Sequence, residues 1–170
     1  ASTADVQRIL GEVGANSMND CCFHNYESSV VSQLKDCYVG NDEFEQLNEL
    51  AENINCMSTN EIVKYKAMLD AVQCQTIETA FAISEEMDGF TLDRDCSSPS
   101  DYVDKVFATL NLPMKEELDF YLSKDGYGKA LMKNNGIDNT SYGMLNPDNG
   151  ISLKEQLQVQ ENSMEMTMSM

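Results

Sequence analysis

Acidic side chains far outnumber basic ones in this chain, and the imbalance restricts the folds that it can adopt. The 170 residues include 29 Asp and Glu against 11 Lys and Arg, which gives a formal net charge of −18. A small soluble domain needs a net charge of magnitude roughly 2–8. A larger excess repels itself in a compact state, repels nucleic acid and attracts any partner that presents a basic groove. The acids must therefore lie either on a solvated tail or on a folded surface.

The composition favours a folded body over an acidic tail. Hydrophobic residues make up 42% of the chain, and 6 Phe and 7 Tyr supply large side chains for a core. This apolar content is well above that of disordered chains. The sequence contains no run of about 18 apolar residues, which a membrane-spanning helix would need. It also contains no recognisable secretory signal. We therefore expect a cytoplasmic protein that does not span a membrane.

Cysteine usage fits the same compartment. The six cysteines include no C-x-x-C pair and no two ligand pairs at the spacing of a zinc site. Reduced thiols are the expected state in a cytosolic protein. Cys56 and Cys74 adjoin helical patterns and are predicted to be small buried apolar groups.

Hydrophobic periodicity predicts several helices, and start and stop signals mark their ends. Ser58-x-x-Glu61 has the sequence of a capping box. Ser98-Pro99-Ser100-Asp101 places an N-cap residue, a proline and an acid at the positions that begin a helix. Gly14 marks the end of the first helix. The expected helices cover residues 5–13, 42–54, 58–72, 76–86 and 98–110, with a further short helix from Pro113.

Strands are predicted to be few and short, at residues 21–26 and 89–92, with a strand or hairpin within 136–145. Residues after Asn146 are expected to form at most a turn or two of helix, and residues 160–170 to be disordered. The expected fold class is α+β, an elongated chain of small subdomains with an acidic helical middle. The expected divisions are an N-terminal α/β subdomain 1–40, an acidic helical bundle 41–88, a C-terminal α+β subdomain 89–146 and a partly disordered tail 147–170.

Most of the negative charge falls on predicted helices rather than on the tail. Residues 36–104 hold 16 acids and three bases. An ordinary exposed helix mixes both signs and gains about 0.2–0.5 kcal/mol from each i,i+4 pair, whereas like charges at that spacing destabilise it by similar amounts. Glu45 and Glu49 are such a like-charge pair. These acids are either the solvated faces of amphipathic helices or a surface retained for the field that it makes.

Rows of carboxylates on helices can imitate the phosphates of DNA. Side chains at i, i+4 and i+7 follow one another every ~5–6 Å along a helix, and duplex DNA carries one negative charge per ~1.7 Å of its axis. Several such rows on one body would present a DNA-like surface to a basic groove. The candidate mimic residues are Asp42, Glu45, Glu49, Glu52, Glu61, Asp70, Glu78, Glu85, Glu86, Asp88, Asp93, Asp95, Asp101 and Asp104.

Other chemistries have weaker support. Cys22 and His24 would share a face of the predicted strand 21–26, which alone is a weak sign of nucleophilic catalysis. A calcium loop is a second alternative, although Ser98 would replace its turn glycine and Asp104 its bidentate Glu. The sequence has no basic patch of the kind that binds nucleic acids. We therefore expect a non-enzyme without a metal or cofactor. The ligands of the alternative calcium loop would be Asp93, Asp95, Ser97, Asp101 and Asp104.

A series of short motifs occurs in order along most of the chain. They are Ala4–Leu10 ahead of Gly14, His24–Glu27, Leu47–Ala51, Asp88–Phe90, Ser98–Tyr102, Leu118–Leu122 and Tyr127–Leu131. Each motif is weakly specific alone. Their order and spacing resemble the ArdA family of antirestriction proteins, which conjugative elements and phages encode. The family pattern also begins with a strand before the first helix, which this sequence does not show.

The resemblance implies an elongated, acidic homodimer with three small subdomains. Such proteins occupy the DNA-binding channel of type I restriction-modification enzymes and leave incoming DNA uncut; whether modification is blocked as well stays open. In the family pattern the charged helical middle is the mimic, and the C-terminal subdomain joins two protomers. The resulting hypothesis is an antirestriction DNA mimic in the cytoplasm of a bacterial host. The alternative is an acidic module that binds or inhibits another basic DNA-binding or defence protein.

Overall fold

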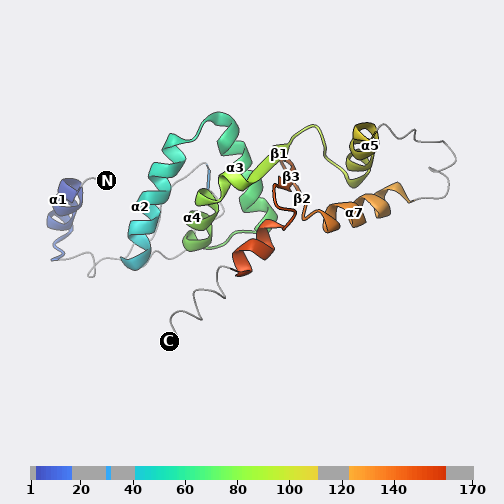
Figure 1. Ribbon diagram of the computed structural model, residues 1–170. Helices are drawn as coiled ribbons and strands as arrows, with labels where there is room; N and C mark the ends of the chain where they lie inside the picture. Colours follow the sequence, from blue (N-terminus) through green and yellow to red (C-terminus); the bar gives the residue numbers. More distant parts are fainter. Residues whose placement is uncertain (1–2, 17–29, 32–40, 111–122, 160–170) are drawn as a thin grey trace. The chain divides into compact units, whose positions relative to one another are not determined.

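The computed structural model describes residues 3–16, 30–31, 41–110 and 123–159 (Figure 1). The strand predicted at 21–26, with its Cys22 and His24, lies outside the described residues. The same holds for the helix predicted from Pro113 and for the disorder predicted at 160–170.

The chain divides into two compact units. The first comprises Ala1–Ile62 and Cys74–Glu85, and the second comprises Val63–Gln73 and Glu86–Met170. The boundaries predicted after residues 40 and 88 do not coincide with this division. The division passes between Ile62 and Val63, inside a helix that the prediction places wholly within the acidic bundle.

The first helix, α1 (Thr3–Val13), begins two residues before the predicted start, so Thr3 lies inside its first turn. It ends at Gly14 as predicted. This glycine has a φ of +74°, and the amide of Ala15 donates to the carbonyl of Leu10 at 3.0 Å. A left-handed glycine followed by a backward amide bond is a common helix end.

In the first unit, α2 (Asn41–Cys56) packs against α4 (Ile77–Glu85). Leu50 of α2 and Ile77 and Ile83 of α4 are almost fully buried. Burying an aliphatic side chain of this size contributes about 1.5–3 kcal/mol, so these residues hold the helix pair together. Asn53 Nδ2 also donates a hydrogen bond to Ser84 Oγ at 3.1 Å across the pair.

The helix α3 (Thr59–Val72) contributes to both units. Its predicted capping box is confirmed, because the amide of Ser58 donates to Glu61 Oε2 at 2.7 Å and the amide of Glu61 donates to Ser58 Oγ at 3.4 Å. Tyr65 and Leu69 are fully buried. The burial of three consecutive residues, Ala67–Leu69, shows that this part of α3 is covered on more than one side.

The second unit contains a three-stranded antiparallel sheet, in the order β1 (Phe90–Asp93), β3 (Gly143–Pro147), β2 (Asp138–Thr140). Met144 and Leu145 of the central strand are fully buried, and successive strand residues point to opposite faces. Both faces of β3 are therefore covered. The strand or hairpin predicted within 136–145 is a hairpin that extends to Pro147, and the helices with this sheet make an α+β fold.

Two polar side chains of α3 bind the backbone around this sheet. Lys64 Nζ donates to the carbonyls of Met87 at 2.8 Å and Phe90 at 3.1 Å, where the 3-10 turn η3 (Met87–Gly89) leads into β1. Asp70 Oδ2 accepts a hydrogen bond from the amide of Ser141, in the β2–β3 turn, at 2.7 Å. The helix thus fixes two separate points of the sheet.

The helices α5 (Pro99–Thr109) and α7 (Lys124–Asn134) pack against each other in the second unit (Figure 1). Gly128 is buried at this contact, and a Cβ atom there would overlap the backbone of Pro99. Leu110, which directly follows the last residue of α5, is 61% exposed.

Residues 153–159 form a last described helix, whose Leu153 is fully buried. None of the helices in the described ranges is long and apolar enough to cross a membrane.

Candidate acidic interaction surface

The two units carry the excess negative charge unequally. The sequence of the first unit holds 13 acidic residues and two basic ones, Arg8 and Lys35. The sequence of the second unit holds 16 acidic and nine basic residues. The first unit is the shorter of the two, so the negative charge is densest in the part of the chain that contains α2 and α4.

Four of the predicted mimic residues are exposed on these two helices. Glu49 and Glu52 lie on α2, and Glu78 and Glu85 lie on α4. Residues three and seven apart share a helix face. At about 1.5 Å of rise per residue, Glu49 and Glu52 are separated by about 4.5 Å along the axis of α2. Glu78 and Glu85 are separated by about 10.5 Å along the axis of α4. We call these four residues the α2–α4 carboxylates.

The α2–α4 carboxylates have no ion pair with a basic residue in the described part of the first unit. Arg8 is the one basic side chain there, and its Nη1 contacts Glu12 Oε1 at 2.6 Å on the same helix. Uncompensated charges of one sign on a folded surface favour association with a surface of the opposite sign.

Asp101, another predicted mimic residue, has a structural role instead. It completes a capping box at the start of α5, in which its Oδ2 accepts the amide of Ser98 at 2.8 Å and its own amide donates to Ser98 Oγ at 3.2 Å. The hydroxyl and amide of Ser97 also donate to Asp101 Oδ2, each at 3.1 Å. Hydrogen bonds, led by that of the Ser98 side chain, lower the pKa of Asp101.

Asp93 and Asp104 are neutralised by lysines. Asp93 Oδ2 pairs with Lys105 Nζ, and its Oδ1 accepts the amide of Asp95 at 3.2 Å. Hydrogen bonding to Asp93 raises the pKa of Lys105. Asp104 Oδ1 contacts Lys124 Nζ at 2.6 Å and so links α5 to α7. These two carboxylates join parts of the second unit and offer little uncompensated charge.

Glu61 and Asp70 are committed to the fold in the same way. Glu61 forms the capping box of α3, and Asp70 holds the β2–β3 turn through the amide of Ser141. Asp70 Oδ1 additionally lies 3.4 Å from Gln73 Nε2.

The remaining candidates divide by exposure. Asp88 and Asp95 are exposed in the second unit, and Glu86 is half-buried. Asp42 and Glu45 lie in the first turns of α2, and their side chains fall outside the described part of the structure.

Asp93 and Asp101, two acids of the alternative calcium loop, bind protein groups in the structure. One carboxylate faces a lysine and the other caps a helix. Among the residues that the structure describes, no group of three or more His, Cys, Asp or Glu is arranged to hold a metal ion.

Three cysteines lie in the described ranges, and none of the three forms a disulfide bond. Cys74 is buried as predicted, whereas Cys56 is exposed, contrary to the prediction, because it is the last residue of α2 and follows the exposed Asn55. Cys96 is buried next to Met132 and Met144. Burial, followed by the negative charges of Asp93 and Asp101, raises its pKa.

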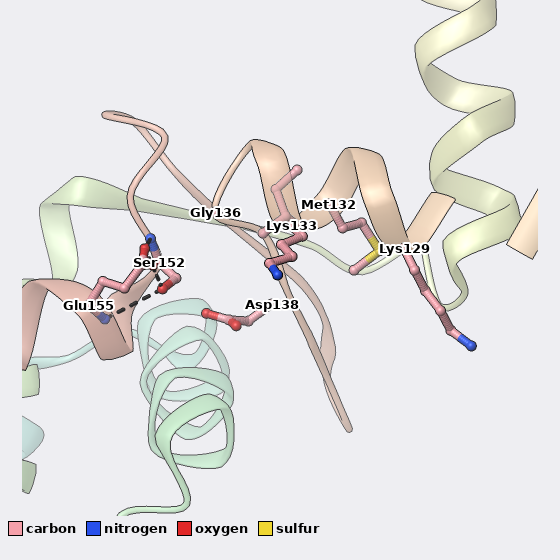
Figure 2. Close-up of a pocket in the computed structure, with 8 residues that line it drawn as sticks. Lys129, Met132, Lys133, Gly136, Asp138, Ser152 and Glu155 are labelled. Atoms are coloured by element: carbon pink, nitrogen blue, oxygen red, sulfur yellow. Dashed lines mark hydrogen bonds between the residues drawn. The ribbon is translucent and has the colours of Figure 1, made fainter. Parts of the chain in front are cut away.

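Sequence reasoning did not single out a pocket of about 290 Å³ in the second unit. It is lined by charged and apolar residues from α7, the segment around the start of β2 and the start of the helix 153–159 (Figure 2). The one local signal was the capping sequence Ser152-x-x-Glu155, which places Glu155 at the pocket edge. The other lining groups come together only through the fold.

No protein-family model matches this chain, and a search of curated proteins found no significant match either.

Proposed function

We propose that this chain is a non-catalytic DNA mimic that inhibits a type I restriction-modification enzyme by occupying its DNA-binding channel. The observation that carries the proposal is the exposure of the α2–α4 carboxylates without a basic partner in the described part of their unit. A channel that binds DNA phosphates is lined by basic side chains, which would act as the partners of these carboxylates. The resemblance to the ArdA family supports the choice of enzyme class.

The proposed contact surface is narrower than the full set of predicted acids. Its described members are the α2–α4 carboxylates of the first unit; the exposed Asp88 and Asp95 are separate candidates on the second unit. Asp93, Asp101 and Asp104 are left out of the surface, because their contacts hold parts of the second unit together.

The family resemblance further leads us to propose a homodimer that acts in the cytoplasm of a bacterial host. Size-exclusion chromatography with light scattering at micromolar concentration measures the mass directly. A dimer mass is expected, and a monomer would contradict this part of the proposal.

Inhibition of DNA cleavage tests the function. A purified type I enzyme is mixed with a plasmid that carries its recognition site, and cleavage is followed as the acidic protein is added. We expect cleavage to stop and to return when more site-bearing duplex is supplied, because both ligands compete for one channel. Cleavage that continues at saturating protein would contradict the proposal.

The same assay separates the competing hypothesis of an acidic module for another basic protein. A protein that binds the enzyme equally well when its channel is filled with duplex DNA would occupy a different surface. That result would favour the acidic module over the mimic.

A further inference from the structure

The pocket in the second unit has a backbone wall and a charged rim. It lies between the last turns of α7, the segment that precedes β2 and the start of the helix 153–159 (Figure 2). Gly136 lines it with a φ of +63°, and a Cβ atom at this position would come within 2.6 Å of the Gly150 carbonyl oxygen and the Ser152 amide. The backbone therefore closes in here without a side chain to fill the space.

A half-buried carboxylate faces this space from β2. Asp138 accepts a hydrogen bond from the amide of Leu153, and burial raises its pKa. Glu155 adds negative charge nearby and Lys154 adds positive charge. No basic group of the described chain lies within ion-pairing distance of Asp138, so its charge is not neutralised by a contact.

An ammonium group also lines the same space. Figure 2 shows the Lys133 side chain directed toward Asp138, while Lys129 points away. Lys129 already pairs with Asp125 at 2.7 Å. Lys133 forms no ion pair with any acid in the described ranges. The pocket thus holds opposite charges that face one space and do not contact each other.

We propose that this pocket binds a small zwitterion of the α-amino acid class. The ammonium group of the ligand would bind Asp138 and Oε1 of Glu155, and the carboxylate of the ligand would bind Lys133. Glu155 has this capacity because its bonds to Ser152 use only Oε2. An ion of a single charge would satisfy one side of the pocket and be repelled by the other.

The size of the pocket is compatible with a small ligand. Pockets for drug-sized ligands occupy about 300–1,000 Å³, so 290 Å³ is at the lower limit. That volume is sufficient for a free amino acid. The proposed binding site does not depend on the proposed inhibition. It is tested without a restriction enzyme, so the two proposals can fail separately.

The test is a nuclear magnetic resonance titration of the ¹⁵N-labelled full chain with glycine through the millimolar range. We expect glycine to shift the amide signals of residues 136–138 and 152–155, and acetate and methylammonium to shift them far less. Asp138→Asn keeps the acceptor for the Leu153 amide, and Lys133→Met changes an exposed side chain, so both variants should fold. Each should weaken glycine binding at least about tenfold, because each loses a charge-assisted hydrogen bond.

Asp148→Asn is the matched control, since Asp148 is an exposed carboxylate that does not line the pocket. It should leave glycine binding unchanged. The proposal is overturned if glycine causes no shifts at these residues, if either single ion matches glycine, or if the Asp148 variant loses as much binding as the Asp138 variant.

Discussion

Replacing all four α2–α4 carboxylates with glutamine should weaken binding to the restriction enzyme strongly. An exposed ion pair contributes about 0.2–1 kcal/mol. If each carboxylate faces one basic group of the channel, the four together contribute about 0.8–4 kcal/mol, which is roughly a 4- to 900-fold rise in Kd. Any single replacement of Glu49, Glu52, Glu78 or Glu85 should raise Kd only about 1.4- to 5-fold by the same conversion.

The substitutions should leave the fold intact. Glutamine is close to glutamate in size, and all four side chains are exposed. Loss of like-charge repulsion should leave the free energy of unfolding unchanged or slightly higher. Kd is measured by isothermal titration calorimetry at fixed low salt, and the unfolding free energy by urea titration. A binding loss accompanied by unfolding would not count as support.

A matched control separates a local surface from the overall charge. Glu12, Asp93, Asp104 and Asp125 are each paired with a basic side chain, so their replacement by amides changes the net charge by the same four units. This control should raise Kd far less than the quadruple glutamine variant, since the removed charges were already compensated. Equal losses for the two variants, or no loss for the glutamine variant, would refute the assignment of the contact surface to α2 and α4.

Four further predictions concern the second unit. Ser98→Ala removes the N-cap of α5 and should lower the free energy of unfolding by about 0.5–2 kcal/mol in a urea titration; an unchanged value would contradict the capping role. Gly128→Ala usually stabilises a helix, but here the new Cβ meets the Pro99 backbone, so a loss of about 1–3 kcal/mol is expected. Hydrogen bonds lower the pKa of Asp101, so its contribution to stability is present above the unfolded pKa of about 3.9 and is lost as the pH falls through the native pKa. Burial raises the pKa of Asp138, so its effect has the opposite sign: relative to Asp138→Asn, the wild type should gain stability as the pH falls through the native pKa toward about 3.9. Urea titrations of the wild type and of Asp138→Asn at several pH values check this, and a parallel response of the two proteins would contradict it.

Local signals in the sequence were sufficient for much of the secondary structure. The capping box of Ser58 and Glu61, the start of α5 at Pro99 and the end of α1 at Gly14 all depend on residues within a few positions of one another. Such signals act through neighbouring backbone groups and can be recognised without the fold.

The helix α7 was missed because its own sequence opposes it. Gly126 and Gly128 each cost about 1 kcal/mol of helix propensity relative to alanine. The close approach of Gly128 to Pro99 favours glycine at that position, but this reason is visible only when α5 and α7 are placed together.

The candidate surface was predicted as a set of acids but not as a division between free and committed groups. The partner of Asp101 is three residues away and could have been foreseen. The partner of Asp70 is 71 residues away in the chain, and Lys124, the partner of Asp104, follows it by 20 residues. Long-range contacts of this kind follow from the fold, so the sequence overstated the number of acids available to a partner.

Displacement of duplex DNA from a type I restriction enzyme across a salt series tests the central claim most directly. A fluorescent duplex bound in the channel is titrated with the acidic protein, and the inhibition constant is measured at increasing salt. Screening shortens the range of charge interactions from about 10 Å at 0.1 M salt to about 3 Å at 1 M. We expect complete competitive displacement and an inhibition constant that rises steeply with salt. Enzyme that binds the duplex and the acidic protein together, or an inhibition constant independent of salt, would contradict the claim of DNA mimicry.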